Sequence, residues 1–292
     1  MSAVVDQAAV QGAAPQQGAR RRTRRSVTLG IGLTLVGVVV VVALVSFFWL
    51  PYAPSDTAGG RLEQPGPAHW LGTDKLGRDL LSQLMVGARI ALAVGLGSVA
   101  IGAVIGITIG LLAAFASAWL DDTISAILDI LIAFPTLLLA MLIVAAQGAS
   151  LGTAILAIGL AMSAVIARLT RVLAKRVLAQ QYVTAARTSG TGWGGVVARH
   201  VLPNIWPTLL VNLALQFGIA VLAEASLSYL GLGAPPPNAS WGRLLQEAQG
   251  TVAVAPVGAI APGVALVVLV IGVNLVADGL RDVADPTRRR SR

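Results

Sequence analysis

Six long apolar segments constrain this chain more than any other feature of its sequence. A helix needs about 20 mainly apolar residues to cross the hydrocarbon core of a bilayer. The segments that meet this requirement are 28–50, 88–117, 123–147, 152–169, 205–230 and 257–280. Only 12% of the residues are charged, about half the share found in soluble domains. The sequence therefore predicts an all-α membrane protein with six transmembrane helices.

Three basic clusters predict how these helices are oriented. Residues 1–27 hold five Arg and one Asp, 168–199 hold six basic and no acidic residues, and 281–292 hold five Arg and two Asp. With six spans all three clusters lie on one side, which the positive-inside rule makes cytoplasmic. The turn at Asp121–Asp122 would lie on that side although it is acidic. Both termini are expected in the cytoplasm, and no nucleic-acid partner is expected.

These features divide the chain into five parts. Arg24–Arg25 before the first span are similar to a twin-arginine export signal, but the apolar run is too long for one, so an uncleaved span is expected. The expected parts are a cytoplasmic basic tail (1–27), a first transmembrane helix (28–50), an extracytoplasmic segment with an amphipathic helix (51–87), a core with five transmembrane helices and a cytoplasmic loop at 170–204 (88–280), and a cytoplasmic tail (281–292).

The loop between the fourth and fifth spans contains two helix-stopping residues at informative positions. Its sequence over 180–204 is QQYVTAARTSGTGWGGVVARHVLPN. Gly190 is suited to ending one short helix, and Pro203 would break the hydrogen-bond ladder of another. We therefore expect a short helix, a glycine turn, a second short helix, and a proline-marked return into the membrane at Asn204.

This loop resembles the signature loop of ABC importer permeases, and its RHVLPN ending resembles their dipeptide, oligopeptide and nickel branch. Three other strings are similar to the same branch: GTDKLGRD with GAR within 72–89, which resembles its C-type subunit, AEASLSYLGLGAPPPNASWG at 223–242, and NLVADGLRDVADP at 274–286. The resemblance implies the type I permease fold in a bacterial-type inner membrane, in a subunit that helps import dipeptides, oligopeptides or nickel chelates.

The resemblance also implies roles for particular residues. The loop would dock onto a separate ATPase, and Thr184 stands where the family usually has Glu, which leaves that one contact open. The coupling residues would be Thr184, Ala185, Ala186, Gly190, His200, Leu202 and Pro203. A second set, expected to be structural or to contact a receptor rather than substrate, comprises Gly72, Thr73, Asp74, Gly77, Arg78 and Asp79.

Two carboxylates inside the expected spans need a reason, because a charge there costs about 2.5–3.5 kcal/mol on insertion scales. In a functional interpretation, Glu224 and Asp129 line the translocation path or contact another subunit. In a structural interpretation, they form hydrogen bonds with a neighbouring helix or with interfacial water. Ala126 stands where the family commonly has Arg, so Asp129 is expected to lack a cationic partner. Kinks are expected at Pro135 and Pro207.

Three glycines spaced four residues apart, Gly102, Gly106 and Gly110, share one helix face and predict close helix packing. This packing is expected within the subunit, and a subunit interface is the alternative.

No P-loop string occurs in the chain, so it is not expected to hydrolyse ATP and no catalytic residue is assigned. Without Cys, and with neither His at metal-ligand spacing, no metal or other cofactor is expected; ATP and Mg²⁺ would bind the partner ATPase. The expected partners are a second homologous permease, one or two P-loop ATPase subunits, an extracytoplasmic substrate-binding protein and membrane lipid. A secondary active transporter is the alternative, although no internal repeat supports it, and a membrane scaffold is a third class.

Overall fold

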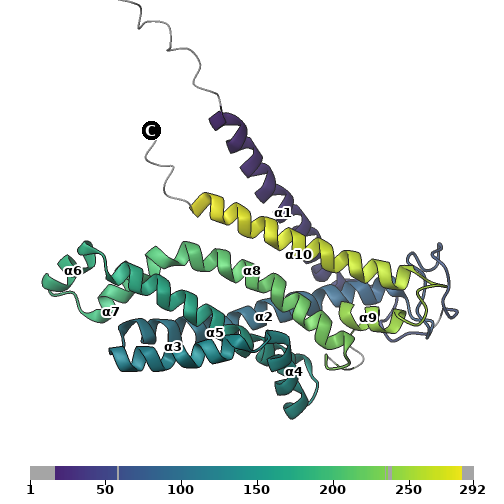
Figure 1. The fold of residues 1–292 in the computed structure, drawn as a ribbon. Coiled ribbons are helices and arrows are strands. Elements are labelled where there is room, and N and C mark those ends of the chain that lie inside the picture. Colours follow the sequence, from purple (N-terminus) through teal and green to yellow (C-terminus); the bar gives the residue numbers. More distant parts are fainter. Residues whose placement is uncertain (1–16, 58, 234, 236–238, 285–292) are drawn as a thin grey trace, which may run out of the picture.

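The computed structural model describes residues 17–57, 59–233, 235 and 239–284, and Figure 1 shows their helical arrangement. The helices are α1 (Gln17–Phe48), α2 (Leu80–Phe115), α3 (Ala118–Ala133), α4 (Thr136–Gln147), α5 (Leu151–Leu178), α6 (Gln181–Thr188), α7 (Trp193–Val196), a π-helical turn (Val197–Val201), α8 (Leu202–Tyr229), α9 (Trp241–Ala248) and α10 (Val257–Ala284). Five of the described helical segments can cross a membrane, or six if α3 and α4 form one broken span. The predicted all-α membrane fold is confirmed.

The centre of the bundle is the packing of α2 against α5. Added Cβ atoms at Gly102 and Gly106 would lie 3.1 Å from the Gly159 carbonyl oxygen and 2.6 Å from the Ser163 carbonyl oxygen, respectively. At Gly110 an added Cβ would lie 2.6 Å from the Thr170 Cβ. The glycine face therefore brings two backbones together inside the subunit, as the sequence predicts.

The expected third span is two helices rather than one. The axes of α3 and α4 differ by 87°, and the break lies at Phe134–Pro135. Proline disfavours helical backbone in the residue before it, and Phe134 accordingly has φ −77° and ψ 130°. Pro207, by contrast, lies inside α8 without ending it. The kink expected at Pro135 is thus a complete break in the helix.

The outer segment differs from its prediction. Leu80–Arg89 does not form a separate amphipathic helix but makes the first turns of α2, so the second span starts at Leu80 rather than at residue 88. Asp79 caps this helix by accepting a hydrogen bond from the Ser82 N–H, and helical structure continues from that cap into the apolar run. The described residues between Trp49 and Asp79 form turns and one isolated bridge.

A short helix on the same side, α9, is absent from the prediction. It packs on α8 at Gly242, where an added Cβ would collide with the Ala225 backbone. In Figure 1, α9 and the outer segment lie at one end of the bundle, and α6 and α7 lie at the opposite end.

Candidate functional site

The loop between α5 and α8 begins as the sequence predicts. Helix α6 ends in a glycine turn in which Gly190 has φ +89°. The Gly190 N–H donates to the Arg187 carbonyl and the Thr191 N–H donates to the Ala186 carbonyl, both at 3.0 Å. This pair of bonds is the usual way in which a left-handed glycine satisfies the last carbonyls of a helix.

The second half of the loop differs from the prediction, because Pro203 does not end the helix that precedes the membrane span. A continuous helical stretch runs over Trp193–Tyr229, with the π-helical turn before Pro203. There the Leu202 N–H donates to the Val197 carbonyl, five residues back. The Asn204 Nδ2 donates to the His200 carbonyl at 2.6 Å. The wide turn lets the helix continue into Pro203, which has no N–H to donate.

The loop is anchored to the bundle by a buried apolar cluster. Val183 of α6 and Val196 of α7 are buried with Val201, Ile205 and Leu209 of the helical stretch that leads into α8. On the loop surface the Arg187 guanidinium lies 3.8 Å from the centre of the Trp193 ring. Because packed interiors transmit displacement rather than absorb it, a push on α6 reaches α5 and α8 directly.

The predicted coupling residues divide into two groups. Thr184, Ala185 and Gly190 are exposed and Ala186 is half-buried on α6 and its turn, so they share one surface. The His200 ring lies beside α6, with its centre 5.9 Å from that of Tyr182. Leu202 packs against the buried cluster, and Pro203 is exposed on α8.

A groove of about 270 Å³ opens beside the α6 surface. Thr184, Arg187, Trp193 and Phe115 are among the residues that line it. The α6 end of the molecule thus offers small exposed residues, a cation and an apolar groove for a protein partner.

Within the outer motif 72–79, the Asp74 carboxylate is held by several donors. It accepts hydrogen bonds from the Leu76 N–H (2.7 Å), the Arg78 N–H (2.9 Å), the Arg78 Nε (2.6 Å) and the Gln83 Nε2 (3.1 Å). Burial raises the pKa of this carboxyl, but the hydrogen bonds from Arg78, Gln83 and Leu76 outweigh burial and hold the pKa below its usual value. Asp74 is therefore ionised, and its hydrogen bonds hold the motif in its folded conformation.

The other residues of the motif also bond within the chain. Gly72 and Gly77 have φ of +80° and +83°, and an added Cβ would collide with a backbone oxygen at either one. The Thr73 hydroxyl donates to the Gly60 carbonyl at 2.6 Å. Asp79, besides capping α2, lies 3.0 Å from the His69 Nδ1. This geometry favours the structural interpretation of the motif.

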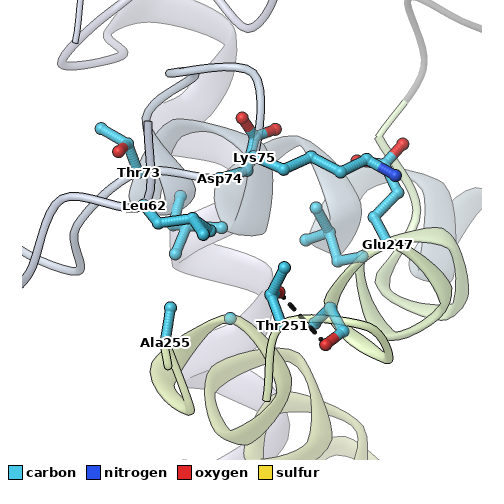
Figure 2. Close-up of a pocket in the computed structure, with 11 residues that line it drawn as sticks. Leu62, Thr73, Asp74, Lys75, Glu247, Thr251 and Ala255 are labelled. Atoms are coloured by element: carbon cyan, nitrogen blue, oxygen red, sulfur yellow. Dashed lines mark hydrogen bonds between the residues drawn. The ribbon is translucent and has the colours of Figure 1, made fainter. Parts of the chain in front are cut away.

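Arg78 joins the motif to α9, since its Nη2 donates to the Glu247 Oε2 at 2.5 Å. A small cavity lies at this junction, and Figure 2 shows Leu62, Thr73, Asp74 and Lys75 among its lining residues. Its volume of about 20 Å³ is enough for one water molecule. It is too small to hold a peptide.

The expectation that Asp129 lacks a cationic partner is wrong. Arg168 of α5 lies 3.1 Å from the Asp129 carboxylate, so the cation comes from another helix rather than from position 126. The acidic turn at Asp121–Asp122 likewise has basic partners on α5. Asp121 accepts two hydrogen bonds from Arg171 at 2.5 and 2.7 Å and one from Lys175.

Glu224 is buried, with 2% of its surface exposed. The Ser228 hydroxyl donates to it at 2.6 Å, and the Ser240 hydroxyl also bonds it. Ser240 is the N-cap of α9, so Glu224 ties α8 to α9. Of its two interpretations, the geometry favours the structural one.

Replacing Glu224 with alanine is expected to lower the melting temperature and the amount of subunit in the membrane. Two buried hydroxyls would lose their acceptor, at a cost of about 1–3 kcal/mol each. Glu224→Gln keeps an acceptor oxygen and should retain most of the protein. Transport per assembled subunit, measured beside abundance, should stay near wild type in both variants. Normal abundance with lost transport in the Gln variant would instead place Glu224 on the path.

Sequence reasoning missed the contacts of Gly87–Arg89. Gly87 leaves room for Trp241, whose Nε1 donates to the Leu84 carbonyl at 2.9 Å. The Arg89 Nε donates to the Ser46 hydroxyl at 2.5 Å, which fixes α1 to α2. The string GAR was visible in the sequence, but its partners lie on distant segments.

The family of binding-protein-dependent transport system inner membrane components matches residues 106–290. The glutathione transport system permease protein GsiD of Pectobacterium atrosepticum is 38% identical over 269 residues, which cover 91% of this chain and 89% of the relative. The dipeptide transport system permease protein DppC of Alkalihalophilus pseudofirmus is 34% identical over 273 residues, which cover 93% and 90%.

Among solved structures, a chain of the MetNI methionine ABC transporter in inward-facing conformations has a TM-score of 0.60 at 22% identity. The likeness covers 70% of this chain and 96% of that chain, and it shows the fold. Because the family match spans more than half of the sequence and the relatives align over nine-tenths of it, this chain belongs to the family of binding-protein-dependent transport system inner membrane components.

Proposed function

We propose that this chain is one of two different permease subunits of an ATP-driven importer for short peptides. The observation that carries the proposal is the exposed α6 surface, which is fixed through buried Val183 to the helices on either side. Because this surface is exposed, a partner protein can bind it, and because it is packed against the bundle, a movement of the partner would be transmitted to the membrane helices.

The chemistry of this surface suits an ATPase partner. Helix α6 presents Thr184 and Ala185 beside the cation Arg187, and the groove next to them is partly apolar. When two ATPase subunits close on ATP, the loops of the two permeases would move together as rigid bodies and reorient the spans. ATP and Mg²⁺ would stay on the ATPase, and this chain would contribute half of the path.

The relatives support peptides as the substrate class. Two of them are named as permeases for glutathione and for dipeptides. In such a system an extracytoplasmic binding protein would deliver the substrate to the end that carries the outer motif and α9. The family match and these names favour this proposal over a secondary active transporter.

The proposal is tested by purifying the tagged chain in mild detergent and identifying the bound proteins by mass spectrometry. We expect a second permease of this family and one or two kinds of P-loop ATPase. ATP hydrolysis by that complex, reconstituted in lipid, should rise when the binding protein and a dipeptide are added. A stable homo-oligomer without an ATPase would contradict the proposal.

A further inference from the structure

An apolar groove lies where the cytoplasmic end of α2 meets α7, next to the groove beside α6. Its volume is about 500 Å³. Leu111, Leu112 and Phe115 of α2 line one part of it, and Trp193 and Val197 of the loop between α5 and α8 line another. Leu112 and Trp193 are 63% and 53% exposed. We call this groove the Trp193 groove, and no described segment of the chain fills it.

The depth of the Trp193 groove in the membrane follows from the length of α2. Near the outer end of α2, the Arg89 Nε donates to the Ser46 hydroxyl, and the Arg89 guanidinium lies 4.1 Å from the centre of the Phe47 ring. A cation among aromatic side chains at the end of a span marks the membrane surface. Thr108, which also lines the groove, follows Arg89 by 19 residues, about 28 Å along the helix axis. Because the hydrocarbon core is about 30 Å thick, the groove begins where the core ends and continues through the headgroup layer to Phe115.

A cation lies at the headgroup end of the groove. The Arg187 guanidinium lies 3.8 Å from the centre of the Trp193 ring. Trp193 packs edge-on against Phe115, with 5.3 Å between the ring centres. Arg187 donates a long hydrogen bond of 3.3 Å to the Thr191 carbonyl, and no carboxylate among the described residues pairs with it. Its guanidinium therefore keeps N–H donors for an oxyanion.

From the depth, the apolar lining and this cation we propose that the Trp193 groove binds one anionic phospholipid of the cytoplasmic leaflet. The glycerol backbone and the start of an acyl chain would lie along Leu112 and Phe115, and the phosphate would pair with Arg187. At this level the alternative to a lipid chain is contact with water or headgroups, which costs free energy for exposed apolar side chains. Cations near the membrane surface attract anionic lipid.

Charge and depth favour a lipid over a protein in this groove. A second permease would bring its own cytoplasmic flanks, which the positive-inside rule makes basic. They would meet a surface that is already basic, since residues 168–199 hold six basic and no acidic residues. An ATPase is confined to the cytoplasm and does not reach the Thr108 end of the groove. The inference goes beyond the proposed function and does not depend on it, because the site needs no particular transported substrate.

Native mass spectrometry of the purified full chain tests the site directly. The chain would be titrated with dioleoyl phosphatidylglycerol, which is anionic, and with dioleoyl phosphatidylcholine, which has the same acyl chains and no net charge. We expect one phosphatidylglycerol to be retained per chain, with a preference of about fivefold or more, the factor that one Arg near the surface supplies. The same lipid should stay bound in the purified complex with the ATPase.

Two glycines of the loop provide a matched pair of variants. An added Cβ at Gly192 or Gly194 has nothing within 4 Å, and neither residue has the positive φ that favours glycine. Only Gly194 lines the groove. Gly194→Trp should therefore fill the groove and weaken retention of both lipids about tenfold or more, whereas Gly192→Trp should retain them as wild type does. The melting temperature of each variant checks its fold.

Arg187→Gln tests the headgroup contact without filling the groove. It changes one exposed side chain, and it should reduce the preference for phosphatidylglycerol to near parity while leaving retention of phosphatidylcholine unchanged. Equal retention of the two lipids by wild type, or equal retention by the Gly194→Trp and Gly192→Trp variants, would overturn the inference. An unchanged preference in Arg187→Gln, or loss of the lipid when the ATPase binds, would overturn it as well.

Discussion

Replacing Gly106 with leucine is expected to remove most of the subunit from the membrane. An added Cβ would lie 2.6 Å from the Ser163 carbonyl oxygen and 2.7 Å from the Ile166 Cβ. The first contact is with backbone of α5, which cannot rotate away as a side chain can. Overpacked cores commonly lose about 1–3 kcal/mol, and a leucine at a backbone contact should reach or exceed the top of that range. Subunit abundance and the melting temperature of the purified complex would measure the loss.

Gly37→Leu is the matched control for this prediction. Gly37 also lies inside a transmembrane helix, α1, but nothing lies within 4 Å of an added Cβ there. This variant should keep near-normal abundance, which separates loss of close packing from any general effect of leucine in place of glycine. Gly106→Ala should lie between the two, because even one methyl group meets the α5 backbone. Wild-type melting of Gly106→Leu would mean that α2 and α5 are not packed as described.

The contrast between Gly106 and the prolines shows what the sequence could and could not predict. Spacing and residue size are local properties, so the glycine face was predictable before its partner was known. Pro135, Pro203 and Pro207 are chemically identical, yet the first breaks a helix, the second follows a π-helical turn and the third lies within α8. Which outcome occurs depends on the surrounding helix geometry, such as the π-helical turn before Pro203, and on packing, neither of which proline itself encodes.

Ion pairs were the least predictable part of the candidate sites. Position 126 indicated that Asp129 lacked a cation, but Arg168 reaches it from α5. Similarly, the motif at 72–79 showed which residues matter without showing that Arg78 reaches Glu247 on α9. Both contacts join segments that are distant in the sequence, and hydropathy carries no information about which charged residues meet.

Replacing Gly190 with valine is expected to abolish most transport while leaving the subunit in the membrane. At φ +89° a side chain costs about 1–2 kcal/mol, and more for a β-branched residue, so the turn that ends α6 would change conformation. Nothing lies within 4 Å of an added Cβ at Gly190, so folding of the bundle should not suffer directly. Peptide uptake and peptide-stimulated ATP hydrolysis would both be measured. A conformational cost of about 1.4 kcal/mol lowers the population of the native turn about tenfold, so uptake should fall about tenfold or more.

Gly190→Asn and Gly190→Arg then separate the conformation of the turn from its contact with the ATPase. Asparagine tolerates left-handed backbone better than other non-glycine residues, so it should preserve the turn and much of the coupling. Arginine adds a long side chain on the exposed surface and should lose transport even where α6 is intact. If Asn fails as completely as Val, the surface at Gly190 must be occupied by the partner rather than merely shaped for it. Wild-type uptake in the Val and Arg variants alike would show that α6 does not couple the permease to its ATPase.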